Sequence, residues 1–241
     1  MSISQTIPLV TGANRGIGRA LVDVLLERGV KRVYAAARDP KSLSDLVSRT
    51  NGRVVPLKLD IRDREQVASA AKAAGDVTLL INNAGRAAFG KALESPEAEI
   101  EADMLTNYFG TLSMLRAFVP VIQANGGGAV ANVLSVVSLA SMPGVAGYSA
   151  SKAALWSLTL ALRENLRSEK VAVHGIYPGP VDTDMARSFK AEKATPLSVA
   201  TAILDGIAAG DEEIFPDVMA RQVREIWQND PKELQRFFAS F

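Results

Sequence analysis

The stretch TGANRGIG, residues 11–18, stands between a short apolar run, Ile7–Val10, and an amphipathic segment, Gly16–Arg28. The run has the length and composition of a buried strand, and the segment has the apolar period of a helix. Three glycines lie in the stretch, Gly12, Gly16 and Gly18. Glycine lets the backbone turn tightly and approach a ligand, and a helix N-terminus offers free N–H groups to an anion. The stretch therefore predicts a phosphate-binding turn between a strand and a helix.

The spacing of these glycines, G-x-x-x-G-x-G, departs from the G-x-G-x-x-G pattern of many dinucleotide sites. A tight turn that only packs the helix against the strand would explain the same residues without any ligand. The order of strand, glycine turn and helix is nevertheless the one that a dinucleotide site requires. Both interpretations stay open on this stretch alone.

The rest of the chain continues the alternation of short apolar runs and longer segments of helical period. Strands are expected near Arg32–Ala36, Val54–Leu59, Val77–Ile81, Ala129–Leu134 and Val171–Tyr177. Helices are expected from Asp63 to about Ala74 with a capping box, from Ser95-Pro96 to about Gln123, and over Tyr148–Ser168. Such alternation predicts an α/β fold of the Rossmann type, a doubly wound and mainly parallel sheet with helices on both faces.

Composition excludes several classes of function. Lys and Arg number 27 against 26 Asp and Glu, so no charge excess favours nucleic acid or an anionic membrane. The chain has no cysteine and one histidine, His174, which argues against a metal site and against a Ser-His-acid hydrolase. His174 lies in an apolar strand and is expected to be structural.

At 241 residues the chain is expected to form one dinucleotide-binding and catalytic domain over residues 1–241. Within it we expect a substrate segment at about 184–200 and an atypical helical tail at about 217–241. The N-terminal residues have no signal-peptide pattern and no stretch of 18 apolar residues occurs, so a cytoplasmic protein without membrane contact is expected.

An arginine stands where a dinucleotide site often carries an acid for the ribose hydroxyls. Arg38 follows the second expected strand, about twenty residues after the glycines. An arginine fork suits a 2′-phosphate, and Arg15 in the glycine turn could reach the same group. These residues favour NADP over NAD, although Asp39 could instead pair with Arg38 at the surface.

Further motifs follow in a characteristic order: NNAG at 82–85, Asn107, Ser135, Tyr148 four residues before Lys152, and PGPVDT at 178–183. Together with TGANRGIG they resemble the short-chain dehydrogenase/reductase family over residues 6 to about 185. The ARD after the second strand resembles its NADPH-dependent carbonyl reductases. The resemblance implies a Rossmann-type fold, a nicotinamide cofactor and the interconversion of a carbonyl compound and an alcohol.

The resemblance also implies a catalytic set of Asn107, Ser135, Tyr148 and Lys152, with Ser138 as the alternative serine. Reduction of a ketone needs a proton at oxygen, and a free tyrosine has a pKa of about 10. A cation roughly 4 Å away at an effective dielectric of about 20 could lower that pKa by about three units. We therefore expect Lys152 to make the Tyr148 phenol more acidic, with small neighbours leaving room for nicotinamide and substrate.

Cofactor contacts are expected from the glycine turn, from the loops after the second, third and fourth strands, and from the PGPVDT segment. Asp60 could bind the adenine amino group or simply shape a turn. The full set is Gly12, Asn14, Arg15, Gly16, Ile17, Gly18, Arg38, Asp60, Ile61, Asn83, Ala84, Gly85, Tyr148, Lys152, Pro178, Gly179, Val181 and Thr183.

The C-terminal part departs from the family pattern, because neither a final strand nor the usual Asp-Gly-Gly segment is found. A homodimer is therefore expected rather than the tetramer of members with the usual ending. Trp156 and Leu160 could face the partner subunit or the core. The resulting hypothesis is an NADPH-dependent reductase of a small-molecule carbonyl substrate. The alternatives are an NADP(H)-binding sensor, and a sugar-nucleotide epimerase, for which the C-terminal part is short.

Overall fold

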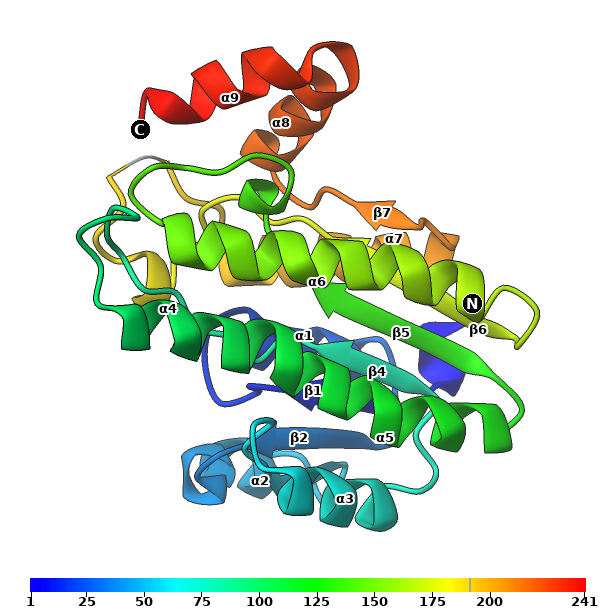
Figure 1. Ribbon diagram of the computed structural model, residues 1–241. Coiled ribbons are helices and arrows are strands. Elements are labelled where there is room, and N and C mark those ends of the chain that lie inside the picture. Colours follow the sequence, from blue (N-terminus) through cyan, green and yellow to red (C-terminus); the bar gives the residue numbers. More distant parts are fainter. Residues whose placement is uncertain (191) are drawn as a thin grey trace.

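The computed structural model describes residues 1–190 and 192–241, so residue 191 of the expected substrate segment lies outside the described residues. Seven described strands form one parallel sheet in the order β3-β2-β1-β4-β5-β6-β7 (Figure 1). The strands are β1 (Pro8–Thr11), β2 (Val33–Ala37), β3 (Val54–Lys58), β4 (Leu79–Asn82), β5 (Gly128–Val133), β6 (Val171–Ile176) and β7 (Glu213–Ile214). The predicted doubly wound fold is confirmed.

Helices cover both faces of the sheet, which is why its inner strands β1, β2 and β4 are buried on both sides. The described helices are α1 (Gly16–Glu27), α2 (Ser44–Ser48), α3 (Arg64–Ala73), α4 (Glu97–Met104), α5 (Thr111–Ala124), α6 (Ala146–Asn165), α7 (Pro196–Ala209), α8 (Val218–Asn229) and α9 (Pro231–Ala239). One buried cluster joins α1, α2 and α7 to the sheet, and a second joins α3 and α5, with α6 packed against it. In β1, Val10 belongs to the first cluster and Leu9 to the second.

The long helix expected from Ser95-Pro96 to about Gln123 is interrupted. A π-helical segment, Leu105–Gly110, joins α4 to α5. The expected cap is also wrong: Pro96 takes the N-cap position without a side-chain bond, and Ser95 donates its hydroxyl to the Lys91 carbonyl at 2.9 Å instead. A π-helical turn inside an α-helix is often found at a functional site.

The C-terminal part contains a strand that the sequence analysis did not find. Strand β7 pairs in parallel with β6, with Glu213 opposite Gly175, and it is only two residues long. Beyond it, α8 and α9 fold back as a helix pair at the top of Figure 1. This tail closes a third apolar cluster in which Phe215 stacks on Tyr177 at 4.6 Å between ring centroids.

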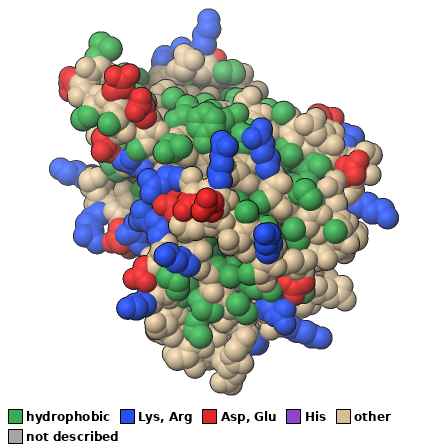
Figure 2. Space-filling model, turned by 60° about the horizontal axis from the view of Figure 1, so that its bottom comes forward, with side chains coloured by type: hydrophobic (Ala, Val, Ile, Leu, Met, Phe, Trp, Pro, Cys, Tyr) green, Lys and Arg blue, Asp and Glu red, His purple; other side chains and the backbone are tan. Residues whose placement is uncertain are grey.

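Trp156 of α6 contacts this tail, because its ring lies edge-on to Trp227 of α8 at 5.9 Å between centroids. Trp156 therefore packs against the C-terminal helices of its own chain, and the expected contact of Trp156 and Leu160 with a partner subunit stays a prediction. The π-helical segment exposes Leu105 and Phe109. Figure 2 shows several groups of hydrophobic side chains on one face of the molecule, with Lys and Arg side chains between them. None of the described helices is both long and apolar enough to cross a membrane.

His174 offers a test of the buried sheet. It is buried in β6, and its Nδ1 lies 2.6 Å from the Asp211 carbonyl, to which a neutral imidazole donates. Burial lowers the pKa of His174 below its ordinary value. The unfolded chain therefore binds a proton near pH 6.5, where the folded chain does not, so stability falls as pH drops below about 6.5. Melting temperatures between pH 5 and 8 measure this loss of stability. In the His174→Asn variant the melting temperature should depend less steeply on pH, and an unchanged dependence would contradict the role given to the buried imidazole.

Candidate active site

A cavity of about 910 Å³ opens at the carboxyl ends of the strands, where ligands of open parallel sheets bind. Nearly all of the residues predicted for a cofactor or for catalysis line it. They are Gly12, Asn14, Arg15, Gly16, Ile17, Arg38, Asp60, Ile61, Asn83, Ala84, Gly85, Ser135, Tyr148, Lys152, Pro178, Gly179, Val181 and Thr183. Two predicted residues, Gly18 and Asn107, are not part of its lining and are buried.

The glycine turn packs too closely for side chains. Gly12 and Gly16 have positive φ values of 65° and 54°. A Cβ on Gly18 would lie 2.2 Å from the carbonyl oxygen of Gly12, and one on Gly16 would lie 2.9 Å from the Thr183 methyl carbon. Gly18 therefore allows the helix to pack on the turn, while Gly12 and Gly16 shape the wall of the cavity.

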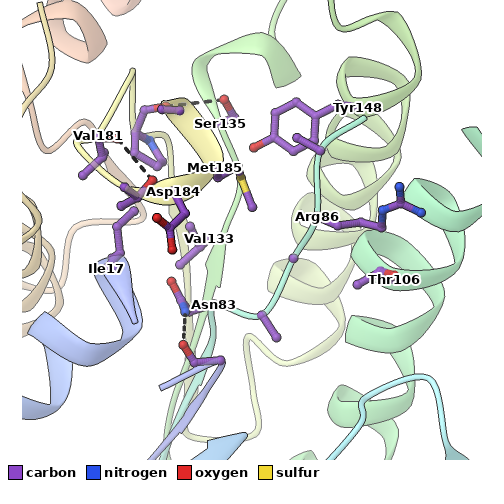
Figure 3. Close-up of a pocket in the computed structure, with 18 of the residues that line it drawn as sticks. Ile17, Asn83, Arg86, Thr106, Val133, Ser135, Tyr148, Val181, Asp184 and Met185 are labelled. Carbon is purple, nitrogen blue, oxygen red and sulfur yellow. Dashed lines mark hydrogen bonds between the residues drawn. The ribbon is translucent and has the colours of Figure 1, made fainter. Parts of the chain in front are cut away.

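The loop after β4 is bound to the glycine turn by Thr11, which the sequence analysis did not single out. The Thr11 hydroxyl oxygen accepts the N–H groups of Asn83 and Ala84, each at 2.9 Å. The Asn83 amide donates to the Thr11 carbonyl at 2.9 Å and to the Gly12 carbonyl at 3.3 Å, and Figure 3 marks a hydrogen bond from this amide. Asn83 therefore braces the turn with its side chain, and its expected contact with a ribose stays a prediction.

Arg38 lies exposed at the carboxyl end of β2, at one end of the cavity. The neighbouring Asp39 does not pair with it among the described residues, because its carboxylate accepts the Lys41 N–H at 3.0 Å and caps a short helical turn. Arg15 does not turn toward Arg38 either; its guanidinium lies 3.3 Å from the Asp184 carboxylate. Arg15 therefore pairs with Asp184 in this structure, and its expected contact with a 2′-phosphate stays a prediction.

Asp60 also has a partner that the sequence analysis missed. Its carboxylate accepts from the Arg62 Nη2 at 2.6 Å and from the Arg62 Nε at 3.0 Å. This pair lowers the pKa of Asp60, and both residues line the cavity. Arg62 thus adds a second cation to the end of the cavity where Arg38 lies, while the proposed contact of Asp60 with an adenine stays a prediction.

The segment 178–183 is positioned by the tail. Asp217, the N-cap of α8, is buried and accepts the Gly179 N–H at 2.8 Å and the Ala220 N–H at 2.8 Å. One carboxylate therefore fixes both the start of the C-terminal helix pair and the loop expected to hold the cofactor. No local sequence pattern reveals this contact, because the two partners are 38 residues apart.

Tyr148 and Ser135 face one another across the cavity. In Figure 3 the Tyr148 hydroxyl points into the cavity toward the side of Ser135. Ser135 begins a short helical turn after β5, and its N–H donates to the Ser138 hydroxyl at 3.1 Å. Ser138 serves as this cap and is not part of the cavity lining, so the structure places Ser135, rather than Ser138, beside the phenol.

Lys152 lies one helical turn after Tyr148 and is buried. Its ammonium donates to the Val133 carbonyl at 2.7 Å and lies 5.7 Å from the centroid of the Tyr148 ring. Burial lowers the pKa of Lys152 to about 8, against the opposing effect of Asp103. The ammonium is therefore still protonated at neutral pH.

The predicted acidification of Tyr148 is not what the structure shows. Burial raises the pKa of Tyr148 to about 12, which outweighs the opposing influence of the nearby Ser135 hydroxyl. Desolvation disfavours the phenolate, and the Lys152 ammonium is directed at the Val133 carbonyl rather than at the phenol oxygen. At neutral pH Tyr148 carries its proton and can donate it.

Asn107 lies in the π-helical segment, fully buried behind Lys152. Its amide donates to the Arg86 carbonyl at 2.9 Å and to the Ser151 hydroxyl at 2.8 Å. Its carbonyl oxygen accepts the Arg86 N–H at 2.9 Å. The side chain therefore joins the loop after β4 to helix α6, which also carries Tyr148 and Lys152.

The cavity lining also includes large apolar side chains, which form its apolar wall. They are Phe89, Met142, Met185, Phe189 and Met219. Phe189 is stacked on the C-terminal Phe241 at 5.8 Å between ring centroids, so the tail supports this wall. Lys190 and Lys193 are not part of the lining. In the part of the chain that the structure describes, no cluster of three or more His, Cys, Asp or Glu could hold a metal ion.

Comparison with known proteins agrees with this geometry. The family model described as short chain dehydrogenase matches residues 6–194. A short chain dehydrogenase from Burkholderia cenocepacia J2315, solved in complex with NADP, is 41% identical over 99% of both chains, with a TM-score of 0.93. A short chain dehydrogenase/reductase from Burkholderia phymatum, solved in complex with NAD, is 26% identical over 98% of this chain and 96% of its own, with a TM-score of 0.85.

An uncharacterised oxidoreductase of Staphylococcus aureus strain MW2 is 30% identical over 92% of this chain and 99% of its own. Sheet order, glycine turn, and the arrangement of Ser135, Tyr148 and Lys152 together define an oxidoreductase fold of the Rossmann type. The chain belongs to the short-chain dehydrogenase family.

The packing of the glycine turn predicts a stability effect. Gly18→Ala should lower the free energy of unfolding by about 1–3 kcal/mol, because its Cβ would overlap the Gly12 carbonyl. Gly75→Ala is the matched control, since a Cβ there would lie 3.8 Å from its nearest neighbour. Urea unfolding of both variants measures the difference, and equal losses in the two would contradict this account of the turn.

Proposed function

We propose that the protein is an NADPH-dependent oxidoreductase that reduces a ketone or aldehyde to an alcohol, in a reversible reaction. The observation that carries the proposal is the meeting of Tyr148 and Ser135 in the cavity that also contains the glycine turn. The buried ammonium of Lys152 lies behind them. A bound nicotinamide would supply the hydride, whereas the protein must position the carbonyl group and provide the proton.

The glycine turn fits a nucleotide cofactor. Gly12 and Gly16 leave the wall of the cavity without side chains, and α1 begins at Gly16 with its N-terminus beside this wall. Free N–H groups and the helix dipole favour a pyrophosphate at that position. The residues that would hold the remaining parts are Asn14, Ile17, Ile61, Ala84, Gly85 and the segment 178–183.

The preference for NADP rests on Arg38. It lines the end of the cavity after β2, and Asp39 is engaged in capping. Arg62 adds a cation at that end, and Ser42 adds a hydroxyl. An exposed guanidinium suits a 2′-phosphate better than it suits ribose hydroxyls. The Burkholderia cenocepacia relative solved with NADP supports this preference, whereas the Burkholderia phymatum relative was solved with NAD.

Each polar side chain has a role in the proposed reduction. Ser135 donates a hydrogen bond to the carbonyl oxygen, which stabilises the negative charge that develops there. Tyr148 donates its proton to the same oxygen, because an alkoxide is more basic than a phenolate. Lys152, still cationic at neutral pH, stabilises the phenolate that Tyr148 becomes.

The substrate end of the cavity supports an apolar carbonyl compound. Methionine and aromatic side chains form that wall, and methionine adapts its shape to varied ligands. The two lysines that would have admitted an acid, Lys190 and Lys193, lie outside it. We expect ketones with alkyl or aryl substituents to be reduced in preference to carboxylate-bearing ones.

The Tyr148→Phe variant tests the proton donor. Loss of the hydroxyl should lower kcat for ketone reduction by roughly 10²- to 10⁴-fold, the usual contribution of a general acid. The affinity for NADPH, followed by cofactor fluorescence, should stay nearly unchanged. Tyr34→Phe is the matched control, because its hydroxyl bonds Asp76 away from the cavity. Substantial activity in Tyr148→Phe would remove the phenol from the reaction.

The Arg38→Asp variant tests the cofactor preference. The NADPH-to-NADH ratio of kcat/KM should fall by roughly 10- to 100-fold, because charge-assisted hydrogen bonds to a phosphate are lost. Arg64→Asp is the control, an exposed arginine at the start of α3 that does not line the cavity. An unchanged ratio in Arg38→Asp would mean that another group binds the 2′-phosphate.

A further inference from the structure

A buried carboxylate, that of Asp103, lies close to helix α6, which carries Tyr148 and Lys152. Asp103 is one turn before Asn107, near the end of α4, and its side chain is fully buried. Its Oδ2 accepts the Ala88 N–H at 3.0 Å, and its Oδ1 lies 3.2 Å from the Arg86 Nε. Burying a carboxylate lowers the stability of a protein unless hydrogen bonds or an opposite charge compensate for the lost solvent.

The partners of Asp103 are the same residues that hold Asn107. Arg86 clamps the Asn107 amide with both its backbone N–H and its carbonyl group. Asp103 fixes the Arg86 side chain and the Ala88 backbone, so it holds this loop on both sides of Ala87. Figure 3 shows Arg86 beside Thr106 of the π-helical segment, at the border of the cavity. A change at Asp103 would therefore be transmitted to Asn107 through the loop.

Asp103 also acts on both titrating groups of the site. Its negative charge raises the pKa of Lys152 and that of Tyr148. The charged groups that act on Asp103 in turn are Arg86 from the loop after β4, Glu99 from α4 and Lys152 from α6. Burial raises the pKa of Asp103, while the Ala88 N–H and the Arg86 guanidinium oppose that rise.

We propose that Asp103 is a positioning residue of the active site, which holds Asn107 through the Arg86–Ala88 loop and supplies a buried negative charge opposite the Lys152 ammonium. The proposal rests on the proposed function for its catalytic consequence, although the charge coupling itself needs no turnover. A merely structural Asp103 would hold the loop without influencing the protonation of Lys152.

The test is a titration of Lys152 by NMR in protein carrying ¹³C at the lysine Cε atoms, with the signal assigned by its loss in Lys152→Arg. Asp103→Asn is nearly isosteric, and its amide oxygen can still accept the Ala88 N–H. In this variant the pKa of Lys152 should fall by about one pH unit, as expected for the loss of one nearby charge. The alkaline limb of kcat/KM for ketone reduction should move to lower pH by the same amount.

Glu99→Gln is the matched control. Glu99 also pairs with Arg86, but its side chain is half exposed and it does not line the cavity. Its substitution should leave the titration of Lys152 and the pH profile in place. An unchanged Lys152 pKa in Asp103→Asn, or an equal change in Glu99→Gln, overturns the proposal.

A second variant covers the case in which Asp103→Asn does not fold. Asp103→Ser keeps a hydroxyl that can accept the Ala88 N–H and removes the negative charge, so the pKa of Lys152 should fall in this variant as well. A rise or no change in this variant contradicts the proposal. Absence of carbonyl reduction by the unaltered protein would instead refute the proposed function, and the NMR titration would still decide the charge coupling.

Discussion

The arrangement around the cavity depends on the burial of a single ammonium group, that of Lys152. Removing an ammonium ion from water costs several kcal/mol unless polar partners replace the solvent. The Val133 carbonyl at the end of β5 accepts one of its hydrogens at 2.7 Å, and the face of the Tyr148 ring lies 5.7 Å away. Asp103 supplies an opposite charge. Because one partner is the backbone of a central strand, this contact holds helix α6 at the end of β5, with Tyr148 in the lining of the cavity.

A chain of buried polar side chains holds helix α6 against strands β4 and β5 further along the helix. Asn82 of β4 donates to Asn132, its register partner in β5, at 2.9 Å, and Asn132 donates to Thr159 of α6 at 3.0 Å. In an apolar core each member of such a chain is costly without its partner, so the three elements have one favoured alignment. The ammonium and this chain of polar side chains together keep α6 from sliding or rotating on the sheet.

The features that the sequence predicted are those encoded locally. Buried parallel strands are short apolar runs, and a glycine turn between strand and helix needs no distant partner, so the fold and most of the cavity lining were predictable. The rest depends on contacts between distant residues. Arg15 pairs with Asp184, which lies 169 positions further along the chain. Strand β7 is two residues long and therefore shows no sequence pattern of its own. The pKa of Tyr148 depends on burial by several elements. For the π-helical segment the sequence contains one local signal, Asn107, a residue of low helix propensity among residues that favour a helix.

The two titrating groups of the site lose their protons in a defined order. The pKa of Lys152 is lowered to about 8 and that of Tyr148 is raised to about 12, both chiefly by burial. Below about pH 8 the phenol and the ammonium are both protonated, which is the state that can give a proton to a carbonyl oxygen. As pH rises, Lys152 becomes neutral first, so Tyr148 would then have to form a phenolate without a neighbouring cation. Burial thus makes the Tyr148 phenol a weak acid, so that its phenolate depends on the positive charge of Lys152 for stabilisation. Groups that keep Lys152 protonated therefore affect proton donation by Tyr148 as well.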